Sequence, residues 1–224
     1  MIGGEASPAA LGFELSSLEA DAVLAQLASQ AGKKYQGCSA TLVGDRVVVA
    51  AGHCVIMNQS SWLNGDPPQV ITADALEYVV GQDVNKPLCS LAVASVHLHP
   101  QIEVTQLYGI QHDVSVSILK QSVTKSCPHV VPMQINAEPL TADFIGKQVL
   151  TGGFGSTDGT YNFSPVRYWS LLEVQQKDQF VIAVGSINKG FPTFGDSSAG
   201  ARGARSGPAL LLLLLLVPLR RRQG

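Results

Sequence analysis

The sequence predicts an all-β protein, folded as a barrel or a sandwich. Hydrophobic residues make up 46% and charged residues 14% of the 224 residues, so the chain can bury a sizeable core and is too apolar to stay disordered. Gly (22 residues) and Pro (12 residues) separate many short Val-rich runs, a pattern typical of strands joined by turns. The formal net charge of −2 gives no reason to expect a nucleic-acid partner.

The clearest hairpin lies between Cys38 and Cys54. The run at 46–51 is rich in Val and Ala, which favours a buried strand, and it ends just before His53. A second apolar run follows Cys38, and the tripeptide 44–46 between the runs is typical of a tight turn. A Cys38–Cys54 disulfide would join the two strands and hold the backbone beside His53. From this segment alone, His53 is either a core residue of a disulfide-bonded hairpin or a side chain delivered into a cleft.

The two runs, Cys-Ser-Ala-Thr-Leu-Val from Cys38 and Val-Val-Ala-Ala-Gly-His-Cys up to Cys54, resemble the segment around the catalytic histidine of chymotrypsin/trypsin-like serine proteases. Gly52 stands where that family usually has Ala. The resemblance covers residues 2–198 and implies a double six-stranded antiparallel Greek-key β-barrel, the chymotrypsin-like fold. The strands and closing helix that follow the nucleophile in the family have no counterpart here, so we expect an incomplete second barrel.

Short runs along the rest of the chain predict further strands. Residues 22–30 have partly helical spacing, but the family places a strand near here and we expect one. Other strands are expected at 69–73, 77–82, 91–97, 114–118, 148–153, 168–174 and 180–184. A polar surface loop is expected at 58–68, and a Pro-rich connector between two halves of the chain at 122–139.

Asp113 stands at the mouth of the alternating run that contains Val114, Val116 and Ile118. Alone, a carboxylate at a strand start is most often a solvated residue. In this chain it follows His53, with a His-Pro pair between them, as in the family segment whose Asp orients the catalytic histidine. The resemblance therefore implies that Asp113 orients His53.

The tripeptide Gly195-Asp196-Ser197 resembles the start of the nucleophile loop Gly-Asp-Ser-Gly-Gly-Pro. The next three residues, Ser198-Ala199-Gly200, do not match that loop. A serine hydroxyl needs a base to take its proton and a third group to orient that base. The resemblance implies Ser197 as nucleophile, His53 as general base and acid, and the backbone N–H groups of Gly195 and Ser197 as the oxyanion hole.

Two further residue roles follow from the resemblance. The start Ile2-Gly-Gly resembles the mature Ile-Val-Gly-Gly terminus, whose freed amino group pairs with an Asp beside the nucleophile, here Asp196. This ion pair requires that Met1 be removed; otherwise the segment is a flexible Gly-Gly start. Phe191 stands at the floor of the primary specificity pocket, where it would favour small or apolar side chains over Lys and Arg.

The domain organisation that we expect has three parts. These are an N-terminal β-barrel at 1–128 carrying His53 and Asp113, a partial C-terminal barrel at 129–200 carrying Ser197, and an aberrant Arg-, Gly- and Leu-rich tail at 201–224. The apolar run in the tail has eleven residues, too few for a stable membrane span, which needs about twenty. A shifted reading frame is the first interpretation of this tail, a sorting signal the second and a membrane anchor the third.

The function expected is peptide-bond hydrolysis by a secreted serine endopeptidase through an acyl-enzyme intermediate. The alternatives are a catalytically inactive pseudoprotease that acts as a binding module, and a truncated gene product. Cys89 and Cys127 are the leftover pair, and a second disulfide suits an exported protein, although no signal peptide is visible. His97 and His99 are two candidate ligands only, so no metal and no cofactor are expected. The expected partners are a polypeptide substrate and protease inhibitors, and the expected state is a monomer.

Overall fold

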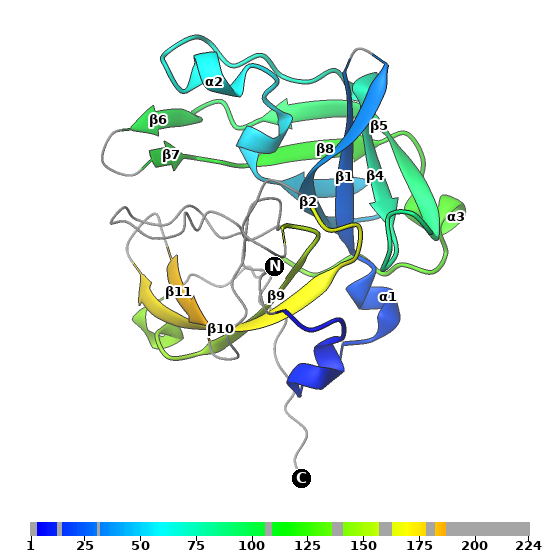
Figure 1. Ribbon diagram of the computed structural model, residues 1–224, viewed down its shortest axis with the longest axis vertical. Coiled ribbons are helices and arrows are strands. Elements are labelled where there is room, and N and C mark those ends of the chain that lie inside the picture. The colour runs from blue at the N-terminus through cyan, green and yellow to red at the C-terminus, as the bar shows by residue number, and fades with distance from the viewer. Residues whose placement is uncertain are drawn as a thin grey trace.

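The protein is an all-β molecule, as the sequence predicts (Figure 1). The computed structural model describes residues 4–12, 15–30, 32–105, 109–135, 141–156, 163–177 and 182–186. Within these ranges every helix is short: α1 (Ser17–Ala20), α2 (Gln59–Trp62), α3 (Val123–Ser126) and the 3-10 turns η1 (Pro8–Leu11), η2 (Gly52–Val55), η3 (Ala73–Ala75) and η4 (Ala142–Phe144). None of the helices in the described ranges combines the length and the apolar character needed to cross a membrane.

Six strands close into an antiparallel barrel, which confirms the first barrel expected from the resemblance. The order around the barrel is β1-β2-β3-β8-β5-β4, with closure by pairing of β4 to β1. The strands are β1 (Val23–Gln30), β2 (Lys33–Gly44), β3 (Val47–Ala50), β4 (Leu76–Val80), β5 (Cys89–Leu98) and β8 (Ser115–Leu119). Closure removes the unpaired edges that an open sheet of these apolar strands would expose.

The later part of the chain forms a separate sheet, which lies beside the barrel in Figure 1. Its order is β11-β10-β9, with β9 (Gln148–Gly153), β10 (Tyr168–Lys177) and β11 (Ile182–Ser186). A two-stranded hairpin of β6 (Glu103–Thr105) and β7 (Gly109–Gln111) extends from the barrel. The division of the chain near residue 128 into a full and a partial barrel stays a prediction, and the predicted tail at 201–224 lies outside the described residues.

One strand prediction is wrong. Residues 69–73 make only an isolated bridge, Ile56 to Val70, and the chain then enters η3. The partner of this segment is the short stretch after η2, which leaves for a loop within a few residues, so no ladder can extend. The predicted polar loop at 58–68 contains the helical turn α2, whose Trp62 is buried.

The barrel interior receives serine side chains from β8 rather than its Val and Ile side chains. Ser115, Ser117 and Leu119 are buried, whereas Val116 and Ile118 are half-buried on the outer face. The alternation that predicted a strand is therefore correct, but its polar side chains point inward. Tyr78 on β4, which is separated from β8 by β5, is also buried, and its hydroxyl lies 2.8 Å from the Ser117 hydroxyl. That contact satisfies two buried polar groups at once.

Several polar contacts attach the β9–β11 sheet to the barrel. The backbone N–H of Phe154 donates to the Ser39 hydroxyl at 2.8 Å, and the Gln36 amide donates to the Phe154 carbonyl at 3.0 Å. The buried guanidinium of Arg167 pairs with Asp21 at 2.9 Å. Burial lowers the pKa of Arg167, and the Asp21 carboxylate opposes that shift. The barrel and the sheet are thus joined by hydrogen-bonded polar side chains.

Tyr78 makes the barrel less stable at alkaline pH. Burial raises the pKa of Tyr78 to about 12, well above the ordinary value for a tyrosine. The folded state therefore favours the neutral phenol, and the stabilisation is complete below about pH 10 and lost as the pH rises towards about 12. We expect the free energy of unfolding to fall by roughly 2–3 kcal/mol across this interval because of Tyr78.

Denaturant unfolding of the parent and of Tyr78→Phe between pH 8 and pH 12 measures this effect. The variant should be less stable by about 1 kcal/mol near neutral pH, because the Ser117 hydroxyl loses its partner. Because only the parent then loses roughly 2–3 kcal/mol, the two stability curves should converge and cross as the pH rises towards about 12. Parallel curves up to pH 12 would show that Tyr78 titrates as an exposed tyrosine does.

Candidate active site

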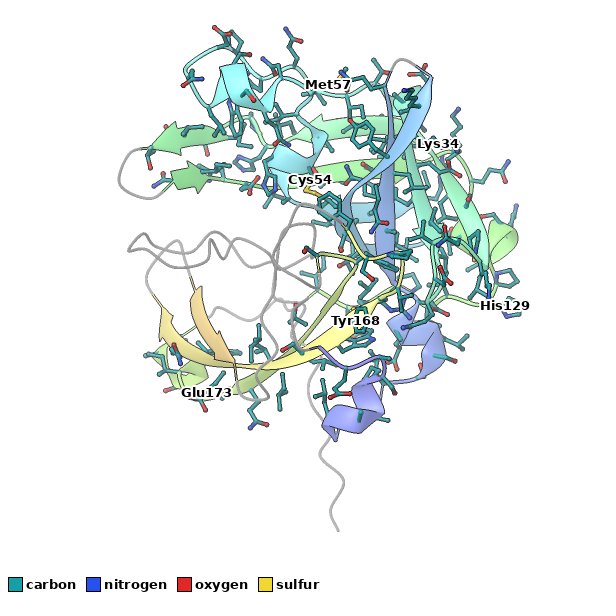
Figure 2. All side chains as sticks on the ribbon, in the orientation of Figure 1. Lys34, Cys54, Met57, His129, Tyr168 and Glu173 are labelled. Carbon is teal, nitrogen blue, oxygen red and sulfur yellow. A yellow bond between two sulfur atoms is a disulfide. The ribbon has the colours of Figure 1, made fainter. Side chains whose placement is uncertain are left out.

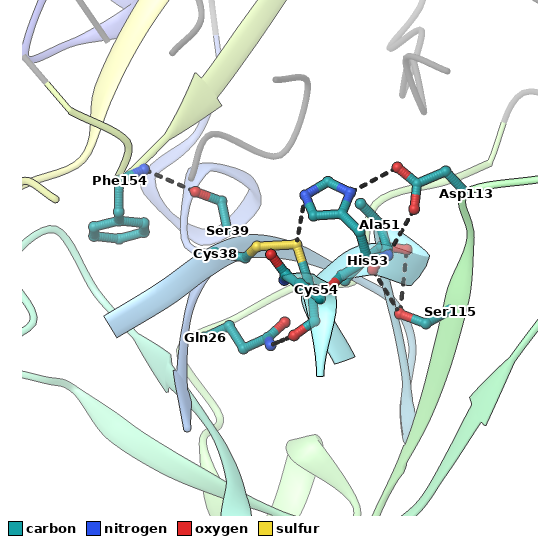
Figure 3. Close-up of a disulfide and its surroundings, with 11 residues drawn as sticks. Gln26, Cys38, Ser39, Ala51, His53, Cys54, Asp113, Ser115 and Phe154 are labelled. Atoms are coloured by element: carbon teal, nitrogen blue, oxygen red, sulfur yellow. Dashed lines mark hydrogen bonds and ion pairs between the residues drawn. A yellow bond between two sulfur atoms is a disulfide. The ribbon is translucent and has the colours of Figure 1, made fainter. Parts of the chain in front are cut away.

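His53 and Asp113 meet because of how β3 and β8 pair. β3 ends at Ala50, whose register partner is Ser115, the first residue of β8. The chain leaves β3 into the turn η2, which carries His53, while Asp113 lies two residues before β8 begins. The antiparallel pairing therefore places the turn that follows β3, with His53, beside the residues that precede β8, with Asp113 (Figure 3).

The Asp113 carboxylate binds His53 through both oxygens. Oδ1 accepts the backbone N–H of His53 at 2.7 Å, and Oδ2 lies 2.7 Å from Nδ1 of the ring. The Asp113 side chain is 0% exposed and that of His53 is 25% exposed. Because a carboxylate accepts hydrogen bonds, Nδ1 carries the proton, and the lone pair of the neutral ring is on Nε2. This arrangement can act as a general base towards an incoming proton.

Ser115 holds the start of the turn η2 that carries His53. Its buried hydroxyl donates to the carbonyl oxygen of Ala51 at 3.0 Å, just before η2 begins. Sequence reasoning did not single out this residue, although a serine two positions after Asp113 on a predicted strand was a usable signal. Residues i and i+2 of an extended segment point to the same face.

The disulfide predicted between Cys38 and Cys54 is present, with its Cα atoms 6.1 Å apart. It links β2 to η2, and Figure 2 shows Cys54 on the side of the barrel that faces the β9–β11 sheet. The Cys54 sulfur lies 3.6 Å from Nε2 of His53, and the buried Gln26 amide donates to the Cys54 carbonyl at 2.8 Å. The second predicted disulfide, Cys89–Cys127, is also present.

The loop at 58–69 also contacts the histidine. Gln59 on α2 donates its side-chain amide to the carbonyl oxygen of His53 at 2.7 Å. Asn58 holds the loop closed, since its Nδ2 donates to the Pro67 carbonyl at 3.0 Å and its Oδ1 accepts the Gln69 N–H at 2.7 Å. The sequence predicted a polar loop here but not these hydrogen bonds, because they depend on how the loop folds back on itself.

The rings of His97 and His99 have different neighbours. The ring of His97 lies 2.8 Å from the Ser95 hydroxyl, and that of His99 stacks on His112 with centroids 5.0 Å apart. In the described part of the chain, Cys38, His53 and Cys54 form a cluster whose sulfur and nitrogen atoms lie within 4.8 Å of one another. The cysteines of that group are joined as a disulfide.

The remaining predicted site residues lie outside the described part of the chain. They are the nucleophile Ser197, the oxyanion-hole residue Gly195, the ion pair of Ile2 and Asp196, and the pocket residue Phe191. Their roles stay predictions. Of the predicted triad residues, the described part of the chain contains His53 and Asp113, and it brings their side chains together.

Comparison with known proteins agrees with this geometry. The family model described as Trypsin matches residues 18–198, most of the chain. The chain is also similar to phenoloxidase-activating factor 3 of Holotrichia diomphalia, with 25% identity over 141 residues. That alignment covers 60% of this chain and 38% of the relative, so the chain spans well under half of the relative's length.

Gly52, immediately before His53, is closely packed. A Cβ atom at this position would lie 2.6 Å from Cδ1 of Ile102, 3.0 Å from Cδ1 of Leu98 and 3.1 Å from the backbone nitrogen of Val114. We expect Gly52→Ala to destabilise the protein by about 1–3 kcal/mol through overpacking, offset by about 0.4–1 kcal/mol from the stiffer unfolded chain. Denaturant unfolding measures the difference.

The closest atom is the tip of a flexible side chain, which provides a control. Ile102→Val deletes Cδ1, so Gly52→Ala should cost less by about 0.5 kcal/mol or more in that background than in the parent. Equal costs in the two backgrounds would mean that Leu98 or the backbone at Val114, rather than Ile102, limits the space.

Proposed function

We propose that this chain, which belongs to the trypsin family, is a serine endopeptidase with His53, Asp113 and Ser197 as its triad. The observation that carries the proposal is the pair of hydrogen bonds that the Asp113 carboxylate accepts from the backbone and the ring of His53. They leave Nε2 as the basic atom of a partly exposed imidazole. Membership of the family supports a serine protease-like protein. The hydrogen-bonded pair of His53 and Asp113, called the dyad below, supports a catalytically active protease.

The proposed reaction has two halves. In the first, Nε2 of His53 takes the Ser197 proton while Oγ attacks the peptide carbonyl, and the resulting imidazolium is stabilised by the buried Asp113 carboxylate. The same proton then passes to the leaving amine, and an acyl-enzyme forms. In the second half, water replaces the serine as nucleophile and releases the acid. The N–H groups of Gly195 and Ser197 stabilise the oxyanion in both halves.

The substrate is a polypeptide, and its side-chain preference follows from Phe191, which would favour small or apolar residues at the cleaved bond. Activation would free the amino group of Ile2 to pair with Asp196. The similar protein named as a phenoloxidase-activating factor supports a role in processing another protein. Two disulfides support action outside the reducing cytosol. The proposal also includes a monomeric state and the binding of protease inhibitors.

A non-catalytic binding module is the second candidate function. Two observations favour it. Ser198-Ala199-Gly200 departs from the Gly-Gly-Pro that follows the nucleophile in the family. In addition, the Asp113 bond to the His53 backbone holds the turn η2, so the dyad has a structural role that persists without catalysis.

Covalent labelling separates the two candidates. We expect a chain freed at Ile2 to take up one fluorophosphonate label, read as a single added mass on the intact protein. Ser197→Ala and His53→Ala should take up none, and Asp113→Asn should react about 10⁴-fold more slowly, because the ring then presents the wrong tautomer. His97→Ala is the matched control, since it removes an exposed histidine outside the dyad and should label like the parent.

Absence of label on a folded parent chain would favour the binding module. Folding is checked by the retained disulfides and by the cooperative unfolding transition. A label that persists in Ser197→Ala would place the reactive serine elsewhere and would overturn the assignment of the nucleophile.

A further inference from the structure

We propose that reduction of the Cys38–Cys54 disulfide converts this site into a zinc site, with the two thiolates and Nε2 of His53 as ligands. The three ligand atoms already lie within 4.8 Å of one another. The proposed metal site does not require that the protein be an active protease. Only its effect on catalysis, described below, rests on the proposed function.

The spacing of the ligand atoms suits zinc. Zinc–sulfur distances of about 2.3 Å and zinc–nitrogen distances of about 2.0–2.1 Å put tetrahedral sulfur and nitrogen ligands about 3.6 Å apart. The Cys54 sulfur and Nε2 of His53 are separated by 3.6 Å. The same geometry puts two sulfur ligands roughly 3.8 Å apart, which the covalent bond between Cys38 and Cys54 prevents. Cleavage of that bond is therefore the step that opens the site.

Asp113 supplies the hydrogen-bond partner that a zinc-binding histidine requires at its other ring nitrogen. A ligating imidazole almost always donates its other N–H to a carboxylate or carbonyl, which fixes the ring and raises its basicity. The fully buried Asp113 carboxylate accepts from Nδ1 and so keeps the Nε2 lone pair available on the side of the disulfide. The Gln26 amide and the Gln59 amide also hold the carbonyls of Cys54 and His53 in place.

The chemistry balances with a dithiol as reductant. The dithiol donates two electrons and two protons, becomes a disulfide itself, and leaves Cys38 and Cys54 as thiols. Binding of Zn²⁺ then releases the two thiol protons and takes the neutral His53 ring without proton loss. Water completes the four ligands, because the ring of His53 is partly exposed to solvent.

Zinc at this position would switch off the proposed protease. The metal occupies the Nε2 lone pair, which is the atom that must take the proton of the attacking serine. The site thus links the redox state of one disulfide to the availability of the catalytic base.

The test uses the full chain, reduced with a phosphine, which converts the disulfide and water to two thiols and a phosphine oxide without adding a competing thiol. We expect one Zn²⁺ or Co²⁺ per reduced chain, a thiolate-to-cobalt charge-transfer absorption, and no such binding by the oxidised chain. His53→Ala should abolish the specific site. Asp113→Asn keeps all three ligands and should weaken the affinity about 10–100-fold.

Two controls keep the result specific to this cluster. Joint replacement of Cys89 and Cys127 by Ser removes the other two thiols and should leave metal binding unchanged. The thermal midpoint of the reduced parent should rise with zinc, and that of reduced His53→Ala should not.

Equal metal affinity in the parent, His53→Ala and Asp113→Asn would show adventitious thiolate binding and would overturn the proposal. So would a reduced chain that binds no metal, or one that stays unfolded when zinc is present. Fluorophosphonate labelling of the oxidised chain is scored separately, so a chain that binds zinc but takes no label refutes the protease and not the metal site.

Discussion

The candidate active site depends on the antiparallel pairing of β3 with β8. The register that sets Ala50 against Ser115 brings the turn after β3 to the residues just before β8. Barrel closure leaves neither strand an edge along which it could slip, because β3 also pairs with β2 and β8 with β5. A shift of one residue would turn the side chains of β8 to the opposite face and would separate Asp113 from His53.

Asp113 has two roles that share one set of contacts. A buried carboxylate is costly unless its oxygens are hydrogen-bonded, and here one oxygen binds the His53 backbone while the other binds the ring. The first bond holds the turn in shape and the second sets the tautomer. Structural stability and the chemistry of the imidazole are therefore provided by the same buried group, which also explains why the arrangement suits either a proton acceptor or a metal ligand.

Polar side chains in the interior replace part of the apolar packing expected for such a barrel. The Tyr78–Ser117 contact is buried inside the barrel, and the Asp21–Arg167 pair joins the residue-21 turn before β1 to the start of the β10 segment. Each of these groups would destabilise the fold if its partner were removed, because the remaining donor or acceptor would stay buried. They make the interior specific at the cost of tolerance to substitution.

The sequence by itself determined the fold class, most of the strands, both disulfide pairs and the family. These features are local or are marked by rare residues: β-branched runs predict strands, four cysteines permit few pairings, and the His-Cys segment is distinctive. Only the tertiary structure decided that the serines of β8 face inward, that 69–73 is not a strand, and that Gln59 and Ser115 support His53. Those outcomes depend on which segments the fold brings into contact. The spacing of residues along the chain can mark a candidate such as Ser115, but it does not identify the partner of that side chain.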